Sequence, residues 1–481
     1  MKRIVVVGAG FSGVTVAAGL ARASAEPLEI VLVDPRPVPG HGLAHGTVHP
    51  DHRLNGPAAI HTIYPDAPLH FVEWVRASGA LDADPGAVAP NGSVYPRRHA
   101  FGRYMAGEFE RHARANPSDS RIEHVRDRAV RLERTVDGLV LALESGRRLA
   151  AGRCVLALGW SDVGVPPPLR AVVDRAGWIG DPWHLDRIAS IPRDARVLLL
   201  GSGLTASDTF AALAAQGHRG PVTALSRRGL RPGPQSRFPS TLTSVWGMLR
   251  DPSPAFLRRH GRLATIRDVM AALRRDIAGL DPAVASWHAP FDELRDSVTH
   301  LWPWMGEAEQ RRYVRHAKGW YDTFRFRNPP QVERIVDDGV ASGQLAFVAG
   351  RLREARAADG GLELAFDPRR AGVQRTLRAD AVINCTGPQP RPGASGNPLW
   401  RSLIADGLVR DHPCGVGVDV DAACRVRDRH GRAHDDLLAI GPPTIGAFGE
   451  ASAVPYIARQ VLDAMPALLG ERAPAATDAR G

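Results

Sequence analysis

The amino-acid sequence predicts an α/β fold made of two Rossmann-like domains with a mostly helical insertion. A buried strand followed by a glycine-rich turn occurs near residue 8, and the same arrangement returns near residue 201. Between residues 236 and 330 the alternation of strands and helices stops, and apolar residues at helical spacing take its place. At 481 residues the chain is long enough for two or three domains.

The first glycine turn has the G-x-G-x-x-G spacing of a dinucleotide-binding motif. The apolar strand of residues 4–7 leads into Gly8, which allows a tight turn, and Gly10 lets a pyrophosphate approach the backbone. Gly13 lets the following helix pack closely on the strand, so that its free N–H groups can bind the phosphates. The expected contacts come from Gly8, Gly10, Phe11, Ser12 and Gly13.

An acidic residue completes this motif. The second strand, residues 29–33, ends in Asp34, where a carboxylate accepts hydrogen bonds from ribose hydroxyls. The alternative is a glycine turn without a ligand, but strand, turn, helix, strand and acid follow in the expected order. We therefore expect an adenine dinucleotide here, FAD.

The glycine- and proline-rich segment of residues 35–46 cannot form a continuous helix or strand, and we expect it to wrap along the FAD. Its expected contacts come from Pro35, Gly42, Leu43 and Ala44. Residues 45–59 mix polar and apolar side chains, which suits a flavin-binding backbone and a plain surface loop equally well. Asn55 is the residue of this segment that we place near the flavin.

The second glycine turn follows the strand of residues 196–200 and has alanine at the third glycine position, which the helix packing tolerates. Its contacts are expected from Gly201, Gly203, Leu204, Thr205 and Ala206. The next strand ends in Ser226, Arg227 and Arg228 instead of an acidic residue. A hydroxyl and two guanidinium groups bind a 2′-phosphate that a carboxylate would repel, so NADPH is preferred over NADH. A surface basic pair unrelated to a cofactor is the alternative.

These elements divide the chain into five segments. They are the first part of the FAD-binding domain (1–190), the first part of the NADPH-binding domain (191–235), the helical insertion (236–330), the second part of the NADPH-binding domain (331–378) and the second part of the FAD-binding domain (379–481). An insertion of this kind is where substrate specificity usually lies, and Arg325 and Arg327 could meet an acidic substrate there. Its tryptophans are more typical of a core than of a binding surface.

Shorter patterns predict the remaining elements. Residues 68–78 and 97–115 have helical spacing, and a helix over residues 453–469 is expected near the end. The runs 122–133 and 139–144 predict a small antiparallel layer.

Composition narrows the possible partners. The net charge of +10 does not indicate nucleic acid or a membrane surface, because the arginines are scattered and no long run of like charge occurs. The four cysteines contain no C-x-x-C pair and no metal-ligand spacing, so no metal is expected. The first strand follows Met1-Lys2-Arg3 directly, and no apolar run reaches the roughly 18 residues of a membrane span. We expect a cytoplasmic protein.

The two glycine motifs, a polar turn at Thr386 and Gly387, and a closing glycine turn at Gly441 are together typical of flavoproteins with two dinucleotide-binding domains. The chain resembles, over nearly its whole length, bacterial FAD/NAD(P)-binding proteins related to class B flavin-dependent monooxygenases. The segments that carry this narrower resemblance are residues 42–45, 226–230, 325–327 and 384–388. Some members of that grouping are amine N-hydroxylases, including enzymes that oxidise aspartate.

Two departures from the family patterns are visible. Residues 178–184 match the F-x-G-x-x-x-H fingerprint of Baeyer–Villiger and flavin-containing monooxygenases in part, with Trp178 at the first position and His184 at the last. Gly441 is followed by Pro442 instead of the usual aspartate, so contact with the ribityl chain must be arranged differently.

The resemblance implies a monooxygenase. NADPH would reduce FAD, and the flavin would take up O2 as a C4a-hydroperoxide that transfers one oxygen atom to a small substrate, with N-hydroxylation of an amine or amino acid expected. His184 and Asn55 are the candidate catalytic residues. The alternative is an NADPH-dependent oxidoreductase or electron donor without oxygen insertion, although a disulfide reductase would need the redox cysteine pair that is missing.

Overall fold

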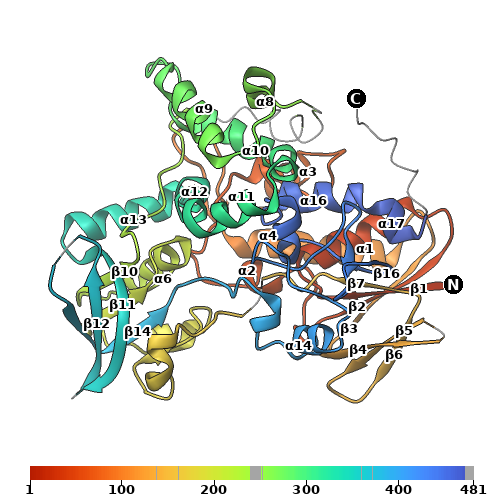
Figure 1. Cartoon of the computed structure of the whole chain (residues 1–481), viewed down its shortest axis with the longest axis horizontal. Helices are drawn as coiled ribbons and strands as arrows, with labels where there is room; N and C mark the ends of the chain where they lie inside the picture. The colour runs from red at the N-terminus through yellow and green to blue at the C-terminus, as the bar shows by residue number, and fades with distance from the viewer. Residues whose placement is uncertain are drawn as a thin grey trace.

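The computed structural model describes residues 1–471 except 137, 161, 239–246, 248–250, 252, 359 and 371. Two helix-covered β-sheets lie next to each other, and a further group of helices lies at the top of the view in Figure 1. None of the described helices is long and apolar enough to cross a membrane. The predicted α/β fold is confirmed.

The first sheet contains the N-terminal strand and the last strands of the chain. In spatial order its strands are β15 (Arg425–Arg427), β16 (Ala433–Ala439), β7 (Arg153–Leu156), β1 (Lys2–Val7), β2 (Leu28–Val33) and β3 (Arg121–Val125). All pairs except β15 with β16 are parallel. The central strands are continuous runs of buried branched residues because both faces of this parallel sheet are covered, one by helices and the other mainly by a small antiparallel sheet.

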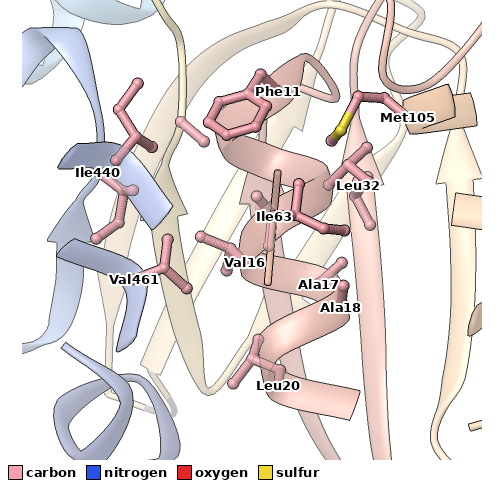
Figure 2. Packing of buried hydrophobic residues seen from close by; sticks show 14 of the residues in the cluster. Phe11, Val16, Ala17, Ala18, Leu20, Leu32, Ile63, Met105, Ile440 and Val461 are labelled. Carbon is pink, nitrogen blue, oxygen red and sulfur yellow. The ribbon is translucent and has the colours of Figure 1, made fainter. Parts of the chain in front are cut away.

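The helix after the first glycine turn is the centre of this domain's core. α1 (Phe11–Ala23) buries nearly all of its residues, and α4 (Arg98–Arg114) and α16 (Val454–Asp463) pack against it. Figure 2 shows Val16 and Leu20 of α1 among apolar side chains that include Val461 from α16. The C-terminal strands β15 and β16 and helix α16 therefore pack into the N-terminal domain.

The second sheet has the order β13 (Arg375–Ala379), β12 (Gly361–Pro368), β11 (Leu345–Ala358), β10 (Val222–Ser226), β9 (Val197–Leu200), β14 (Ala381–Asn384) and β8 (Trp178–Ile179). β8 and β14 belong to it although the boundaries predicted at 190 and 379 put both strands in the first domain. Their sequences indicate burial, but a short buried strand carries no signal of the sheet that it joins.

A third, antiparallel sheet contains β4 (Ala129–Thr135), β5 (Gly138–Leu143) and β6 (Arg148–Ala151). The predicted antiparallel layer is confirmed for β4 and β5, but the run that begins at residue 122 is wrong as one strand. It divides into β3, which pairs with β2 in the first sheet, and β4.

The insertion is helical, as predicted. Its helices are α8 (Ala255–His260), α9 (Ile266–Ala278), α10 (His288–Trp304), α11 (Glu307–Arg312), the π-helical turn η4 (Tyr313–Ala317) and α12 (Lys318–Arg325), and α13 (Pro330–Ala341) follows them. Their own core includes Phe256, Leu273, Leu294 and Trp302. The Trp302 ring N–H donates to the backbone oxygen of Gly446 at 2.7 Å, so the insertion also packs on the first domain.

Short helices complete the fold. They are α2 (Gly42–His45), α3 (His70–Ala77), α5 (Leu185–Ala189), α6 (Leu204–Ala215), α14 (Pro398–Ala405), α15 (Ile445–Phe448) and α17 (Met465–Leu469). The helices predicted over residues 68–78 and 97–115 are confirmed as α3 and α4, and the predicted terminal helix is divided into α16 and α17.

Candidate functional site

The first glycine turn contains two glycines that packing requires and one that it does not. Gly8 has a φ of 106°, and a Cβ there would lie 2.3 Å from the backbone oxygen of Ala157. A Cβ on Gly13 would lie 1.9 Å from the oxygen of Gly8. A Cβ on Gly10 would meet only the Cα of Gly42, at 3.4 Å. Gly10 thus leaves open the space that a pyrophosphate needs in front of α1.

No side chain caps the N-terminus of α1. The first N–H groups of a helix have no partner within the helix, and the helix dipole makes that end positive. An uncapped N-terminus beside an open glycine therefore fits the phosphates of a dinucleotide. Phe11 and Ser12, the first two helical residues, are both buried there.

Asp34 lies at the carboxyl end of β2, beside the same turn. One carboxylate oxygen accepts from the backbone N–H of Ala9 at 3.0 Å, and the other accepts from that of Arg36 at 2.9 Å. A carboxylate has about four acceptor positions, so capacity remains for ribose hydroxyls. The ribose contact stays a prediction, and the structure adds a second role in which Asp34 holds the turn.

The loop expected to wrap along the cofactor does fold back onto the turn. Gly40 donates its N–H to the oxygen of Ala9 at 2.7 Å, and Gly42, with a φ of 53°, faces Gly10. The other contacts predicted in this loop, Pro35, Leu43 and Ala44, are exposed.

Gly441 closes the first site from the far end of the chain. It follows β16 with a φ of 85°, and a Cβ there would lie 2.5 Å from the hydroxyl oxygen of Ser12. Its N–H donates to the side-chain oxygen of Gln460 at 2.8 Å. The closing turn therefore lies at the N-terminal end of α1, where its cofactor role was predicted.

The second glycine turn repeats this geometry. Gly201 has a φ of 117°, and a Cβ there would lie 2.3 Å from the oxygen of Cys385, whereas a Cβ on Gly203 would meet nothing within 4 Å. Gly203 precedes α6, which also begins without a side-chain cap. Leu204, Thr205 and Ala206 form the first turn of that helix.

Thr386 and Gly387 lie beside this second turn, because Cys385 contacts Gly201. Their predicted association with the first domain is wrong for the same reason as that of β14, which pairs with β9. The Thr386 hydroxyl donates to the Asn384 side-chain oxygen at 2.7 Å.

The strand that follows α6 ends at the residues predicted to bind the 2′-phosphate. The Ser226 hydroxyl oxygen accepts from the Ser202 hydroxyl at 2.8 Å and from the Gly229 N–H at 2.9 Å, so it already stabilises the turn. Arg227 is exposed, and Arg228 donates to the backbone oxygen of His316 at 3.1 Å. Within the described part of the chain, neither arginine forms an ion pair with a carboxylate.

The two candidate catalytic residues lie near the junction of the domains. The backbone oxygen of Asn55 accepts from the side chain of Gln235 at 2.8 Å. His184 is exposed and follows Trp183, whose ring faces His52 at 6.1 Å between centroids. No geometry here assigns a catalytic contact to Asn55 or His184, and both stay predictions.

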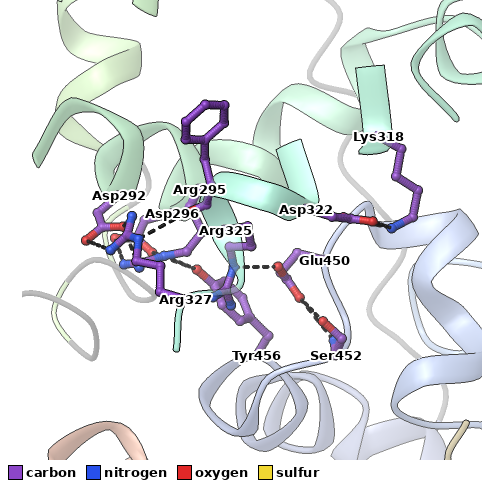
Figure 3. A network of polar contacts seen from close by, with 11 residues as sticks. Asp292, Arg295, Asp296, Lys318, Asp322, Arg325, Arg327, Glu450, Ser452 and Tyr456 are labelled. Carbon is purple, nitrogen blue, oxygen red and sulfur yellow. Dashed lines mark hydrogen bonds and ion pairs between the residues drawn. The ribbon is translucent and has the colours of Figure 1, made fainter. Parts of the chain in front are cut away.

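Arg325 and Arg327 belong to a polar network between the insertion and the first domain (Figure 3). Arg325 pairs with Glu450 at 3.1 Å, and Arg327 pairs with Asp292 at 2.7 Å. Burial raises the pKa of Glu450, but the Arg325 charge and hydrogen bonds from Ser452 outweigh it and hold that pKa below its usual value. The sequence does not indicate these partners, because Arg325 and Glu450 are 125 residues apart.

The described residues offer no alternative redox or metal centre. No group of three or more His, Cys, Asp or Glu side chains among them could hold a metal ion. All four cysteines are buried and unpaired, and burial raises the pKa of Cys154 and of Cys385 to about 12.

Residues 5–161 match a family model described as FAD-NAD(P)-binding. No curated protein matches the sequence of the chain. Among solved structures, the chain is similar to the ornithine N-hydroxylase of Kutzneria sp. 744, determined with reduced FAD, NADP+ and L-ornithine, at 16% identity and a TM-score of 0.61, covering 97% of this chain and 98% of that one. The L-lysine 6-monooxygenase of Pseudomonas syringae gives the same four values.

The thioredoxin reductase of Lactococcus lactis is similar at 11% identity and a TM-score of 0.51, covering 98% of this chain and 99% of that one. The chain therefore has an FAD/NAD(P)-binding domain and the two-domain fold of these flavoproteins, which confirms the fold expected from the resemblance.

Proposed function

We propose that the protein is a FAD-dependent, NADPH-using monooxygenase that hydroxylates the nitrogen of a small amine or amino acid. The strongest support for two bound dinucleotides comes from Gly10 and Gly203, where a Cβ would meet little or nothing of the protein. Each of them precedes a helix whose N-terminus has no side-chain cap. The fold that places them is similar along its whole length to ornithine and lysine hydroxylases.

The protein's own groups bind and orient the two cofactors. The N–H groups at the start of α1 and α6 bind the two pyrophosphates, and Arg227 and Arg228 bind the 2′-phosphate that marks NADPH. When bound, FAD would supply the redox chemistry, namely hydride acceptance from NADPH and activation of O2. The helices of the insertion pack onto the first domain through Trp302 and Arg325, and we expect them to limit access of water to the flavin.

The main alternative is an NADPH-dependent oxidoreductase or electron donor without oxygen insertion. The fold is compatible with it, since a thioredoxin reductase is also similar. Disulfide reduction requires an accessible thiolate pair, whereas the four cysteines here are buried and unpaired. Oxygen insertion is therefore the function we favour.

An acidic amino acid is the substrate class that we infer. Arg325 and Arg327 supply two guanidinium groups in the insertion, and a substrate carboxylate would compete with Glu450 and Asp292 for them. The reacting amine must be neutral, and its reference pKa lies near 8 or above, so activity should rise between about pH 7 and pH 9.

The test is NADPH-dependent O2 consumption by the purified protein with amines, amino acids and ketones, together with detection of a hydroxylamine product. We expect one hydroxylamine for each O2 consumed with the correct substrate. Gly203→Val is a suitable control, since it should retain FAD but lose reduction by NADPH. If NADPH reduces the flavin but no candidate is oxygenated, the electron-donor alternative replaces the monooxygenase.

A further inference from the structure

An exposed tryptophan of the insertion lies beside the predicted 2′-phosphate site. Trp320, on α12, is 36% exposed, although the tryptophans of this region were expected to be core residues. The guanidinium carbon of Arg228 lies 5.4 Å from the centroid of its ring. The guanidinium carbon of Arg369 lies 5.6 Å from the same ring.

Two segments far apart in the sequence converge on Arg228. α12 lies against it at Gly319, where a Cβ would be 2.3 Å from a guanidinium nitrogen of Arg228. Arg369 directly follows β12, and its backbone N–H donates to the backbone oxygen of Ala349 at 3.0 Å. Ala349 is in register with Ser226, so Arg369 lies at the same end of β10 as Arg228.

The charges in this cluster are not compensated by the protein. Among the residues that the structure describes, no carboxylate forms an ion pair with Arg227, Arg228 or Arg369. Burial, followed by the charges of Arg227 and Arg369, lowers the pKa of Arg228. Like charges this close are unfavourable unless an anion joins them.

We propose that Arg369 and Trp320 complete the binding site for the 2′-phosphate of NADPH. Arg369 binds the phosphate together with Arg227 and Arg228, because guanidinium groups match the geometry of phosphate oxygens. Trp320 is a positioning residue whose ring holds the two guanidinium groups against it in place. The inference deepens the proposed function and makes the insertion a part of the nucleotide site.

The experiment is calorimetric titration of the FAD-loaded protein with 2′,5′-ADP and with 5′-AMP, which differ by the 2′-phosphate. In Arg369→Gln the Kd for 2′,5′-ADP should rise about tenfold or more, since the variant loses a charge-assisted hydrogen bond to the 2′-phosphate. The Kd for 5′-AMP should change less than twofold. Trp320→Leu should reduce the preference for 2′,5′-ADP in the same direction. Arg353→Gln is the matched control, because Arg353 is exposed in the same sheet but paired with Asp367.

Unchanged affinity for 2′,5′-ADP in Arg369→Gln would overturn the inference, and so would an equal loss for both nucleotides. An unchanged preference in Trp320→Leu would remove Trp320 from the site. Flavin content and circular dichroism of each variant report folding. The proposed function fails separately, when no amine is hydroxylated by a protein that still prefers 2′,5′-ADP.

Discussion

Individual glycines in the two turns serve different purposes, which their spacing alone does not reveal. Gly8 and Gly13 are required by packing, because any side chain there would overlap backbone atoms. Gly10 is free of that constraint, which agrees with the predicted approach of a pyrophosphate to its backbone. A variant at each position therefore separates folding from binding.

Gly10→Val should fold normally and lose FAD. Its side chain would fill the space of the pyrophosphate, whereas the nearest protein atom to its Cβ is 3.4 Å away. The measurement is the ratio of flavin absorbance to protein absorbance after purification, with circular dichroism to verify folding. Gly107→Ala is the control, because this glycine lies within α4 with open space around it, and it should retain full flavin. Full FAD occupancy in Gly10→Val would show that the binding turn has been misassigned.

At the level of secondary-structure elements, the ends of parallel strands form both sites. The turns after β1 and β9 face α1 and α6, and the ends of β2 and β10 supply an acid in one domain and arginines in the other. The two domains use the same framework and differ where the second strand ends. We propose that this difference determines nucleotide choice.

Replacing Arg227 and Arg228 together with alanine should raise the Kd for NADPH on the order of a hundredfold, while the Kd for NADH changes little. The reason is the loss of two charge-assisted contacts with the 2′-phosphate. Rapid-mixing measurements of flavin reduction at a series of nucleotide concentrations give both constants. Arg227→Ala alone is the cleaner comparison, because Arg228 also bonds to His316. Equal weakening of both nucleotides would mean that the arginines bind another group.

At the scale of the whole molecule, one nearly buried ion pair joins the two domains. Arg98, at the start of α4, donates to Asp208 on α6 at 2.6 Å, and the two side chains are 11% and 12% exposed. Burial raises the pKa of Asp208 despite the neighbouring Arg98 charge. Removing the partner of this carboxylate should therefore destabilise the folded protein.

Arg98→Met should lower the free energy of unfolding by about 3–5 kcal/mol, because it leaves a buried carboxylate unpaired. Adding Asp208→Leu should restore part of that loss. Urea-induced unfolding of the single and double variants measures both effects. Arg219→Met is the control: Arg219 and Asp194 are 68% and 74% exposed, and their pair should contribute at most about 1 kcal/mol. Strictly additive effects would show that Arg98 and Asp208 are not coupled.

The lowered pKa values of two buried histidines in the first domain indicate that the folded protein loses stability in acid. Burial lowers the pKa of His52 to about 3 and that of His61 to about 4, from an ordinary value near 6.5. Both are neutral in the folded protein, whereas the unfolded chain binds protons below about pH 6.5. Their contribution to stability is therefore complete above that pH and is lost as the pH falls toward 4, at about 1.4 kcal/mol per pH unit for each histidine.

Thermal melting should show a lower Tm at pH 5.5 than at pH 7.5, and His61→Asn should reduce the difference. Asparagine can still donate to the oxygen of Pro57, which the His61 ring contacts at 2.9 Å. An identical pH dependence in the variant would indicate that other groups cause the loss.

Local patterns predicted the fold class and the position of both glycine turns, because glycine spacing and strand burial are short-range properties. Gly8, Gly10, Gly13 and Asp34 could be located this way, since the residues of one turn and its strands are close in the chain. α3 and α4 were found for the same reason.

Long-range pairings account for what these patterns missed. β14 joins the second sheet through hydrogen bonds with β9, a strand about 180 residues earlier, and no local property of either strand specifies that choice. The sequence gives no sign that Arg325 is paired with Glu450 or that the Trp320 ring contacts two arginines. The partners of a charged or aromatic side chain depend on which distant segments the packed fold brings to it, and packing is a property of the complete chain.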